Sequence, residues 1–297
     1  MKNMCKIIII PFLLFYCFSY SQYQKSDFNI YVFKSRYSEE GKSFINEQPY
    51  LSEIKLLGGY MIDPHKKGTI NLESVDKHLK KLFPKPNDEG VLCVNLENRY
   101  YDNIRNYDVT HRKYKEAIQE FKKLINFIRI RRPNVKLGIY GLPYRTYYKS
   151  QTKWNVGTKL DAILSEVDYI FPSLYVLYPD KEKGEKANNI YWNKNLDTAF
   201  SYADRLDKKV IPFVWYIVST NNKMFGGELL GKNEMSRYLE HIKNYISPYN
   251  CKVDGVVWWE SSKKSFKKNV QSATHLNESI DLKNSTILKT YTQHLKN

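Results

Sequence analysis

Short apolar segments recur along this chain at wide intervals and indicate buried strands. They occupy residues 28–33, 56–62, 91–96, 136–140, 169–174, 210–214 and 253–259. Most are apolar at successive positions rather than at alternate ones, as expected for strands covered on both faces. The pattern therefore predicts seven strands of a parallel sheet, of which 56–62 carries the weakest signal.

Helical patterns lie between most of these segments. One begins at Asn71, a suitable N-cap, and keeps helical spacing to Leu82, just before Pro84. The clearest follows Thr110 and ends before Pro133. Its apolar stripe consists of Tyr114, Ala117, Ile118, Phe121, Leu124, Ile125 and Ile128. Two further helices are expected around residues 196–203 and 235–245.

The alternation of strand and helix predicts an α/β fold, a TIM-like parallel (β/α) barrel made irregular by its seven strands. A doubly wound open sheet is the rival architecture. Such sheets often carry a glycine-rich phosphate loop after the first strand, whereas residues 35–38 here read SRYS. The barrel is therefore the preferred prediction.

The amino terminus has the three parts of a secretory signal peptide. Lys2 and Lys6 precede an apolar run at 7–18, and a small-x-small triplet follows at 19–21. The run is too short for a membrane span, which needs about 20 apolar residues. We expect a signal peptide at 1–21, a single barrel of catalytic type at 22–265 and a C-terminal helix or tail at 266–297. The mature protein is expected to be secreted or periplasmic, without membrane insertion, and monomeric.

Charge and cysteine content constrain function only weakly. The full chain carries a formal charge of +16, and loss of Lys2 and Lys6 with the signal leaves +14. This charge suits an anionic polysaccharide or surface, although lysines scattered over solvated helix faces explain it equally well. Cys93 and Cys251 are the cysteines that follow the signal, and they either form one disulfide or remain two buried thiols.

The third apolar segment ends in the best candidate for chemistry. Asn95 and Glu97 follow a buried strand and, because side chains alternate, both point toward the mouth of the expected barrel. Partial burial would raise the pKa of Glu97 and favour the protonated form that a leaving group needs. The alternative is that Glu97 pairs with Arg99 or Arg145 and only holds a loop in place.

Aromatic residues stand at or near the ends of other strands. They are Tyr140, Tyr175, Tyr216 and Trp259. Flat rings around a carboxylate are a common way to hold sugars, so these four are candidate substrate-binding residues. Aromatic residues make up 15% of the chain, and any one of the four taken singly is more often core than ligand.

The order of motifs resembles the hyaluronidase-type glycoside hydrolases. In that family a glycine-led strand ends in Asp-x-Glu, and residues 89–99 here read EGVLCVNLENR. Later strands of the family carry Gly-x-Tyr-x-x-Pro, Phe-Pro-Ser-x-Tyr, Pro-aromatic and Gly-Val-Val-x-Trp motifs. These are matched at 138–143, 171–175, 212–213 and 255–259. The matches extend over most of the predicted barrel.

The resemblance implies an irregular parallel barrel and a substrate-assisted retaining mechanism on N-acetylhexosamine-containing glycans. Glu97 matches the family's proton donor, Tyr175 a tyrosine near the acetamido group and Trp259 a tryptophan of the same subsite. Asn95 stands where the family has the aspartate of Asp-x-Glu. This arrangement resembles that of some endo-β-N-acetylglucosaminidases, which use Asn-x-Glu. Tyr144 stands where the family has a later aspartate. The family's late-strand tyrosine would align near Val218, so Tyr216 could replace it only with a shift in the alignment. The family's usual cysteine pairs are missing.

Two alternatives to this hydrolase remain open. The exchange at Asn95 would suit a carbohydrate-binding barrel without catalysis. A glycosidase of another clan would need two protein carboxylates, for which Glu260 at the last strand end could serve as the second. The histidines show no paired ligand spacing, so no metal and no cofactor is expected. No nucleotide motif is present, and nucleic-acid binding would rest on charge alone.

Overall fold

The structure, a computed structural model, describes residues 28–260 and 280–292. The predicted signal peptide and the predicted boundary between residues 265 and 266 lie outside the described residues. Within the predicted C-terminal segment, the structure describes one helix, α11 (Ile280–Thr292).

Eight parallel strands form one curved sheet. They are β1 (Asn29–Val32), β2 (Leu51–Gly58), β3 (Gly90–Asn95), β4 (Val135–Tyr140), β5 (Tyr169–Phe171), β6 (Lys209–Val210), β7 (Phe213–Val214) and β8 (Gly255–Trp258). The order across the sheet is β6-β5-β4-β3-β2-β1-β8-β7. Because neighbouring strands are parallel, the chain crosses back to the same end of the sheet between one strand and its neighbour. The predicted α/β class and the parallel barrel arrangement are confirmed.

The sheet closes through one interrupted strand. The strands β6 and β7 stand at opposite ends of the sheet order but are separated in the chain only by Ile211 and Pro212. The amide of Ile211 donates to Ile170 on one side, and Pro212 accepts from the amide of Val257 on the other. Residues 209–214 therefore act as one seventh barrel position, in agreement with the seven predicted segments.

The prediction for the second strand was wrong in its bounds. The strand β2 starts at Leu51, and residues Gly59–Ile62 form a short helix, α2. In β2 the residues Leu51, Ile54 and Leu57 are buried, while Glu53 and Lys55 interrupt the apolar pattern. Pairing with β1 and β3 defines this strand, because ladder hydrogen bonds override a weak local pattern.

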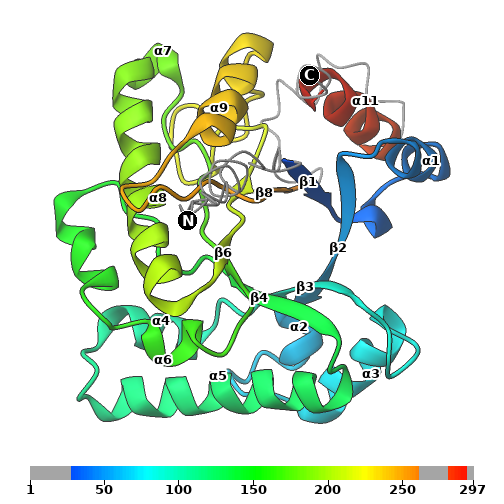
Figure 1. Ribbon diagram of the computed structural model, residues 1–297, viewed down its shortest axis with the longest axis vertical. Coiled ribbons are helices and arrows are strands. Elements are labelled where there is room, and N and C mark those ends of the chain that lie inside the picture. Colours follow the sequence, from blue (N-terminus) through cyan, green and yellow to red (C-terminus); the bar gives the residue numbers. More distant parts are fainter. Residues whose placement is uncertain (1–27, 261–279, 293–297) are drawn as a thin grey trace, which may run out of the picture.

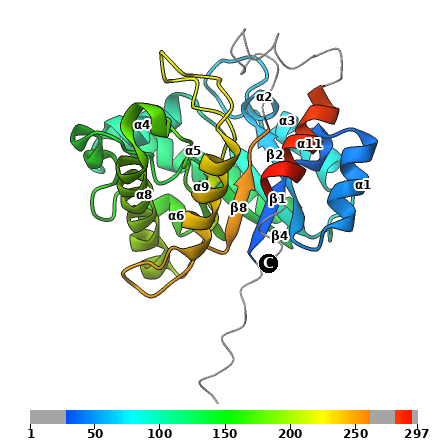
Figure 2. The ribbon, with the colours of Figure 1, turned by 90° about the horizontal axis from the view of Figure 1, so that it is seen from above.

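Helices pack around the outside of the barrel (Figure 1). They are α1 (Glu39–Glu47), α3 (Leu72–Leu82), α4 (Arg99–Asn106), α5 (Arg112–Arg131), α6 (Asp161–Leu164), α7 (Asp180–Lys183), α8 (Glu185–Leu206) and α9 (Lys232–Asn244). The helix α11 packs against α1 and α9, as the views in Figures 1 and 2 agree.

The two strongest helix predictions are confirmed. In α3 the Asn71 side chain accepts a hydrogen bond of 2.9 Å from the amide of Ser74, which makes Asn71 the N-cap. The helix α5 buries the whole predicted stripe from Tyr114 to Ile128. The later pair of helices is longer than the patterns indicated, with α8 extending from Glu185 to Leu206 and α9 beginning at Lys232.

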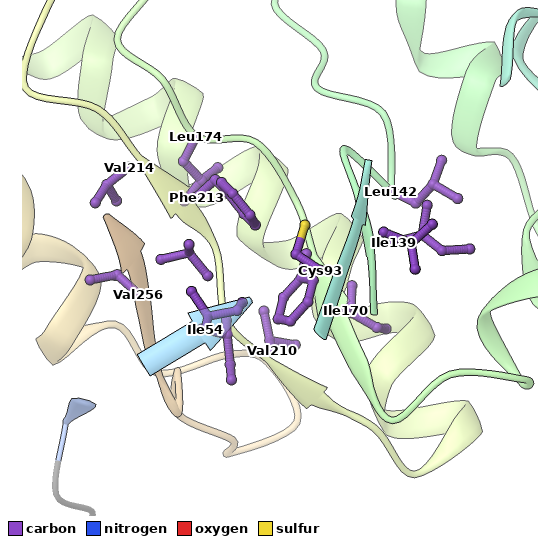
Figure 3. Close-up of a cluster of buried hydrophobic side chains, with 14 of the residues drawn as sticks. Ile54, Cys93, Ile139, Leu142, Ile170, Leu174, Val210, Phe213, Val214 and Val256 are labelled. Carbon is purple, nitrogen blue, oxygen red and sulfur yellow. The ribbon is translucent and has the colours of Figure 1, made fainter. Parts of the chain in front are cut away.

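Apolar side chains fill the barrel and form a floor beneath its carboxyl-terminal mouth. In Figure 3, Ile54, Cys93, Val210 and Phe213 from four strands belong to one buried cluster. Near the mouth, the ring centroid of Phe213 lies 6.2 Å from that of Phe33, 5.8 Å from that of Phe171 and 4.8 Å from that of Tyr140. In Figure 2, α2 and the loop after β7 rise on the same side of the barrel.

Two observations bear on compartment and redox state. Cys93 and Cys251 are free thiols, and Cys93 is fully buried. Among residues 28–260 and 280–292, no helix has both the length and the apolar character that a membrane span requires.

The contact between β4 and β5 at Gly138 requires a residue without a side chain. A Cβ at Gly138 would lie 2.6 Å from the carbonyl oxygen of Tyr169 and 2.7 Å from the ring of Phe171. We therefore expect Gly138→Ala to lower the free energy of unfolding by about 1–3 kcal/mol, measured by urea denaturation. The matched control is Gly59→Ala in α2, where the nearest atom would be 3.7 Å away and stability should change little. Equal stability of the two variants would contradict the argument.

Candidate active site

Asn95 and Glu97 stand at the carboxyl end of β3, at the mouth of the barrel. Asn95 is the last residue of β3 and is paired in register with Gly58 of β2. Glu97 follows two residues later, immediately before the turn into α4, where the Asn98 side chain accepts a hydrogen bond from the amide of Tyr100. Asn98 caps α4 directly after Glu97, whose side chain is exposed at the mouth.

Glu97 borders a pocket of about 400 Å³. This volume is within the range of small-molecule sites. The pocket is built by segments that follow β3, β4, β5 and β7, all at the carboxyl ends of strands. Its lining residues are Glu97, Tyr101, Arg105, Tyr140, Gly141, Tyr144, Arg145, Tyr147, Tyr148, Gln151, Trp154, Ser173, Leu177, Tyr178 and Asn221.

The pKa of the Glu97 carboxyl is raised above the ordinary glutamic acid value. The largest cause is desolvation, because protein atoms surround the carboxyl within the concave mouth although its side chain remains open to solvent. Arg145 opposes the rise in pKa, Asp102 adds to it, and a hydrogen bond with the Asn95 side chain and the charge of Arg105 oppose it. The net effect is a raised pKa on a carboxyl that retains access to a ligand.

In the alternative interpretation, Glu97 only forms an ion pair with an arginine. In the described part of the chain, neither Arg99 nor Arg145 forms an ion pair with Glu97 within 4.0 Å. The Arg99 guanidinium donates to the Tyr100 hydroxyl at 2.9 Å. The Arg145 guanidinium lies 3.4 Å from Ser173 Oγ and 3.4 Å from the carbonyl oxygen of Tyr175. Arg145 is thus held by uncharged oxygens, and its charge acts on Glu97 without a direct ion pair.

Three of the predicted aromatic residues lie together beside Asn95 and Glu97. Tyr140 lines the pocket, and its ring centroid lies 6.4 Å from that of Trp259 and 6.2 Å from that of Tyr175. The Trp259 ring also meets Phe33 edge-on, and the Arg36 guanidinium lies 4.4 Å from its centroid. Tyr175 is buried beneath Tyr140 and, like Asn95 and Trp259, does not line the pocket.

The structure places Tyr216, which was predicted to bind substrate, outside the pocket. Its side chain is fully buried, its ring stacks on Trp258 with centroids 5.3 Å apart, and it does not line the pocket. The neighbouring residue, Trp215, packs against Tyr175 instead, with centroids 5.0 Å apart. The Trp258 ring lies 6.4 Å from that of Tyr291 in α11, so Tyr216 packs toward the outer helix layer.

Glu260 does not border the pocket that contains Glu97. It is 1% exposed, and neither carboxyl oxygen has a hydrogen-bond partner among the described residues. Burial raises its pKa well above the ordinary value, opposed by Arg36. Arg36 also donates to the backbone carbonyl of Glu260 at 3.2 Å. Glu260 is therefore a buried acid just after β8 that does not line the pocket.

Most of the pocket was not predicted from the sequence. The missed residues include Tyr101 and Arg105 of α4 and the ring-bearing residues between Tyr144 and Trp154. The segment at 144–154 reads YRTYYKSQTKW, and its density of aromatic and basic residues was the available signal. In the described part of the chain, no group of three or more His, Cys, Asp or Glu residues is arranged to hold a metal ion.

Comparison with known proteins identifies a structural neighbour only. No protein-family model and no curated protein sequence matches the chain. A monoclinic crystal structure of bee venom hyaluronidase matches with a TM-score of 0.59 at 16% identity, covering 87% of this chain and 99% of that one. A second, of bee venom hyaluronidase in complex with a hyaluronic acid tetramer, matches with a TM-score of 0.56 at 18% identity, covering 86% and 98%. The chain therefore has a hyaluronidase-like fold, as the order of motifs led us to expect.

Arg145 is the largest influence that lowers the pKa of Glu97. Removing its positive charge disfavours the carboxylate form, so Arg145→Gln should raise the pKa of Glu97 further. The measurement is an NMR titration of the carboxyl carbons, with Glu97→Gln to assign the signal. Arg112→Gln, at an exposed position that begins α5, is the matched control and should leave the pKa unchanged. A lowered or unchanged pKa in Arg145→Gln would contradict the assigned cause.

Proposed function

We propose that this protein is a secreted, hyaluronidase-like glycoside hydrolase that cleaves N-acetylhexosamine-containing glycans, with Glu97 as its acid and base. The observation that carries the proposal is an acid of raised pKa at the edge of a ring-lined pocket at the carboxyl end of a barrel. The bee venom protein of the same fold binds a hyaluronic acid tetramer, which supports a glycan as the ligand class. Export rests on the amino-terminal signal pattern.

The reaction fits a substrate-assisted retaining path. The acetamido oxygen of the sugar attacks its own anomeric carbon, and the bond from that carbon to the glycosidic oxygen breaks. Glu97 gives its proton to the departing oxygen, so the leaving sugar departs as an alcohol. Glu97 then takes a proton from water, which attacks the anomeric carbon and reopens the cyclic intermediate. No protein nucleophile is required.

Asn95 is suited to orienting the acetamido group. Its side-chain carbonyl can accept the acetamido N–H while its amide N–H₂ remains available to the carboxyl of Glu97, with which Asn95 is hydrogen-bonded. A neutral amide stabilises the positive charge of the cyclic intermediate less than a carboxylate would. This arrangement favours slow turnover. The non-catalytic alternative is the extreme case, in which the pocket binds a glycan without cleaving it.

Glu97→Gln should abolish the acid function while keeping the shape of the site. The expected loss is about 10²- to 10⁴-fold in the release of new reducing ends from hyaluronan, chondroitin or chitin-type oligomers. Glu116→Gln, an exposed carboxyl on α5, is the matched control and should retain full activity. Normal turnover by Glu97→Gln would rule out its role. Saturable glycan binding without turnover in the wild type would establish the binding-protein alternative.

Glu260→Gln separates this mechanism from one with two protein carboxylates. Because Glu260 lies outside the pocket, the substitution should leave kcat/KM within about twofold of the wild type. Thermal unfolding of the same sample checks that the buried amide is tolerated. A loss as large as that of Glu97→Gln, in a folded variant, would support the two-carboxylate mechanism.

A further inference from the structure

Four rings form one side of the pocket at a distance from the residues that the mechanism uses. We call Tyr147, Tyr148, Trp154 and Tyr178 the aromatic wall. The first three belong to the segment between β4 and α6, and Tyr178 follows β5. All four line the same cavity as Glu97.

The rings of the wall are packed against one another. The centroid of Tyr147 lies 5.2 Å from that of Tyr148 and 4.7 Å from that of Tyr178. The hydroxyls of Tyr148 and Tyr178 are hydrogen-bonded to each other. Farther along, Trp154 meets the ring of Tyr144 edge-on at 6.4 Å, and the Arg105 guanidinium lies 5.4 Å from the Trp154 centroid.

Side-chain amides hold the backbone that carries three of these rings. Gln151 accepts hydrogen bonds from the amides of Tyr147 and Tyr148, at 2.6 and 2.8 Å. Asn155 accepts from the amide of Tyr144 at 2.9 Å and donates to its carbonyl at 2.7 Å. Asn195 of α8 makes the same pair of bonds with Thr146. The loop is therefore ordered before any ligand arrives, which lowers the entropic cost of binding.

Packing against the core accounts for only part of the aromatic wall, because Tyr147 and Trp154 pack against the core and still keep exposed surface. Tyr144, in the same loop, does serve the core, since it is 3% exposed and its hydroxyl donates to the carbonyl of Tyr101. Tyr148 is by contrast 52% exposed, and Tyr147, Trp154 and Tyr178 are only partly buried. Clusters of amphipathic rings that keep exposed surface are characteristic of binding surfaces.

The wall is next to Glu97 but separate from the residues that would hold the reacting sugar. Asn95 and Trp259 lie outside the pocket, whereas Glu97 and Tyr140 border it. Glu97 must reach the oxygen that joins the reacting ring to its neighbour. A sugar that reacts between Asn95 and Trp259 therefore places the adjoining ring in the pocket beside the wall.

We propose that the aromatic wall is a subsite for the sugar ring joined to the reacting N-acetylhexosamine through the cleaved bond. It binds the apolar face of a pyranose ring by stacking. The inference rests on the proposed function for the placement of the reacting sugar. It adds that recognition requires at least two linked rings and that Trp154 and Tyr148 supply much of the affinity for the second.

Tryptophan provides a direct positional readout. The chain has five tryptophans, so the Glu97→Gln protein labelled with 5-fluorotryptophan gives a short ¹⁹F NMR spectrum, assigned by single Phe substitutions. A chitin-type or hyaluronan tetrasaccharide should shift the Trp154 and Trp259 resonances and leave that of the buried Trp192 in place. N-acetylhexosamine alone should shift only Trp259. A tetrasaccharide that shifts Trp259 but not Trp154 would overturn the inference and leave the proposed function intact.

Affinity tests the same subsite independently. In the Glu97→Gln background, Trp154→Ala and Tyr148→Ala should each weaken tetrasaccharide binding about tenfold by calorimetry, while Trp154→Phe, which keeps a ring, should retain most of it. Tyr249→Ala removes a ring that is 46% exposed outside the pocket and should have no effect. Unchanged affinity in both alanine variants would overturn the inference.

If the wild type binds an oligosaccharide without cleaving it and the wall variants weaken binding, the proposed subsite is supported and the proposed hydrolase activity is contradicted. If no oligosaccharide binds or is cleaved, both fail.

Discussion

Closure of the parallel ladder is the constraint on which the rest of the structure depends. The chain from Lys209 to Val214 pairs with β5 through its first half and with β8 through its second. Pro212 has no amide hydrogen, so its position tolerates the interruption, while its carbonyl still accepts from Val257. Because every strand runs in the same direction, closure brings all their carboxyl ends to one mouth, and residues distant in sequence meet there.

Basic side chains outnumber carboxyls at the mouth of the barrel. Arg145 and Arg105 line the pocket, and Arg36 lies over the ring of Trp259, while Glu97 is the only carboxyl among the lining residues described. Arg105 is paired with Asp102 at 2.7 Å, whereas the contacts of Arg145 are with uncharged oxygens. With Asn95 in place of a second carboxylate, the site carries excess positive charge. Such an excess of positive charge attracts anionic ligands.

Glu97 and the aromatic wall are held in position by different parts of the structure. Glu97 is positioned by the end of β3 and by the Asn98 cap, which are parts of the barrel itself. The aromatic wall is positioned by amide side chains that clamp a loop outside the barrel. A different loop would therefore change the ligand of the pocket while the barrel keeps its acid in place.

The sequence by itself determined the barrel class, the course of α3 and α5 and the position of Glu97 just beyond a strand. These follow from local periodicity and capping, which neighbouring residues decide. Only the tertiary structure decided that β2 begins at Leu51, that Tyr216 faces outward and that Glu260 is buried outside the pocket. Strand pairing sets the register and the facing of each side chain, and a single strand carries no record of its partners. The aromatic wall likewise arises because Asn195, on a distant helix, holds the loop that presents it.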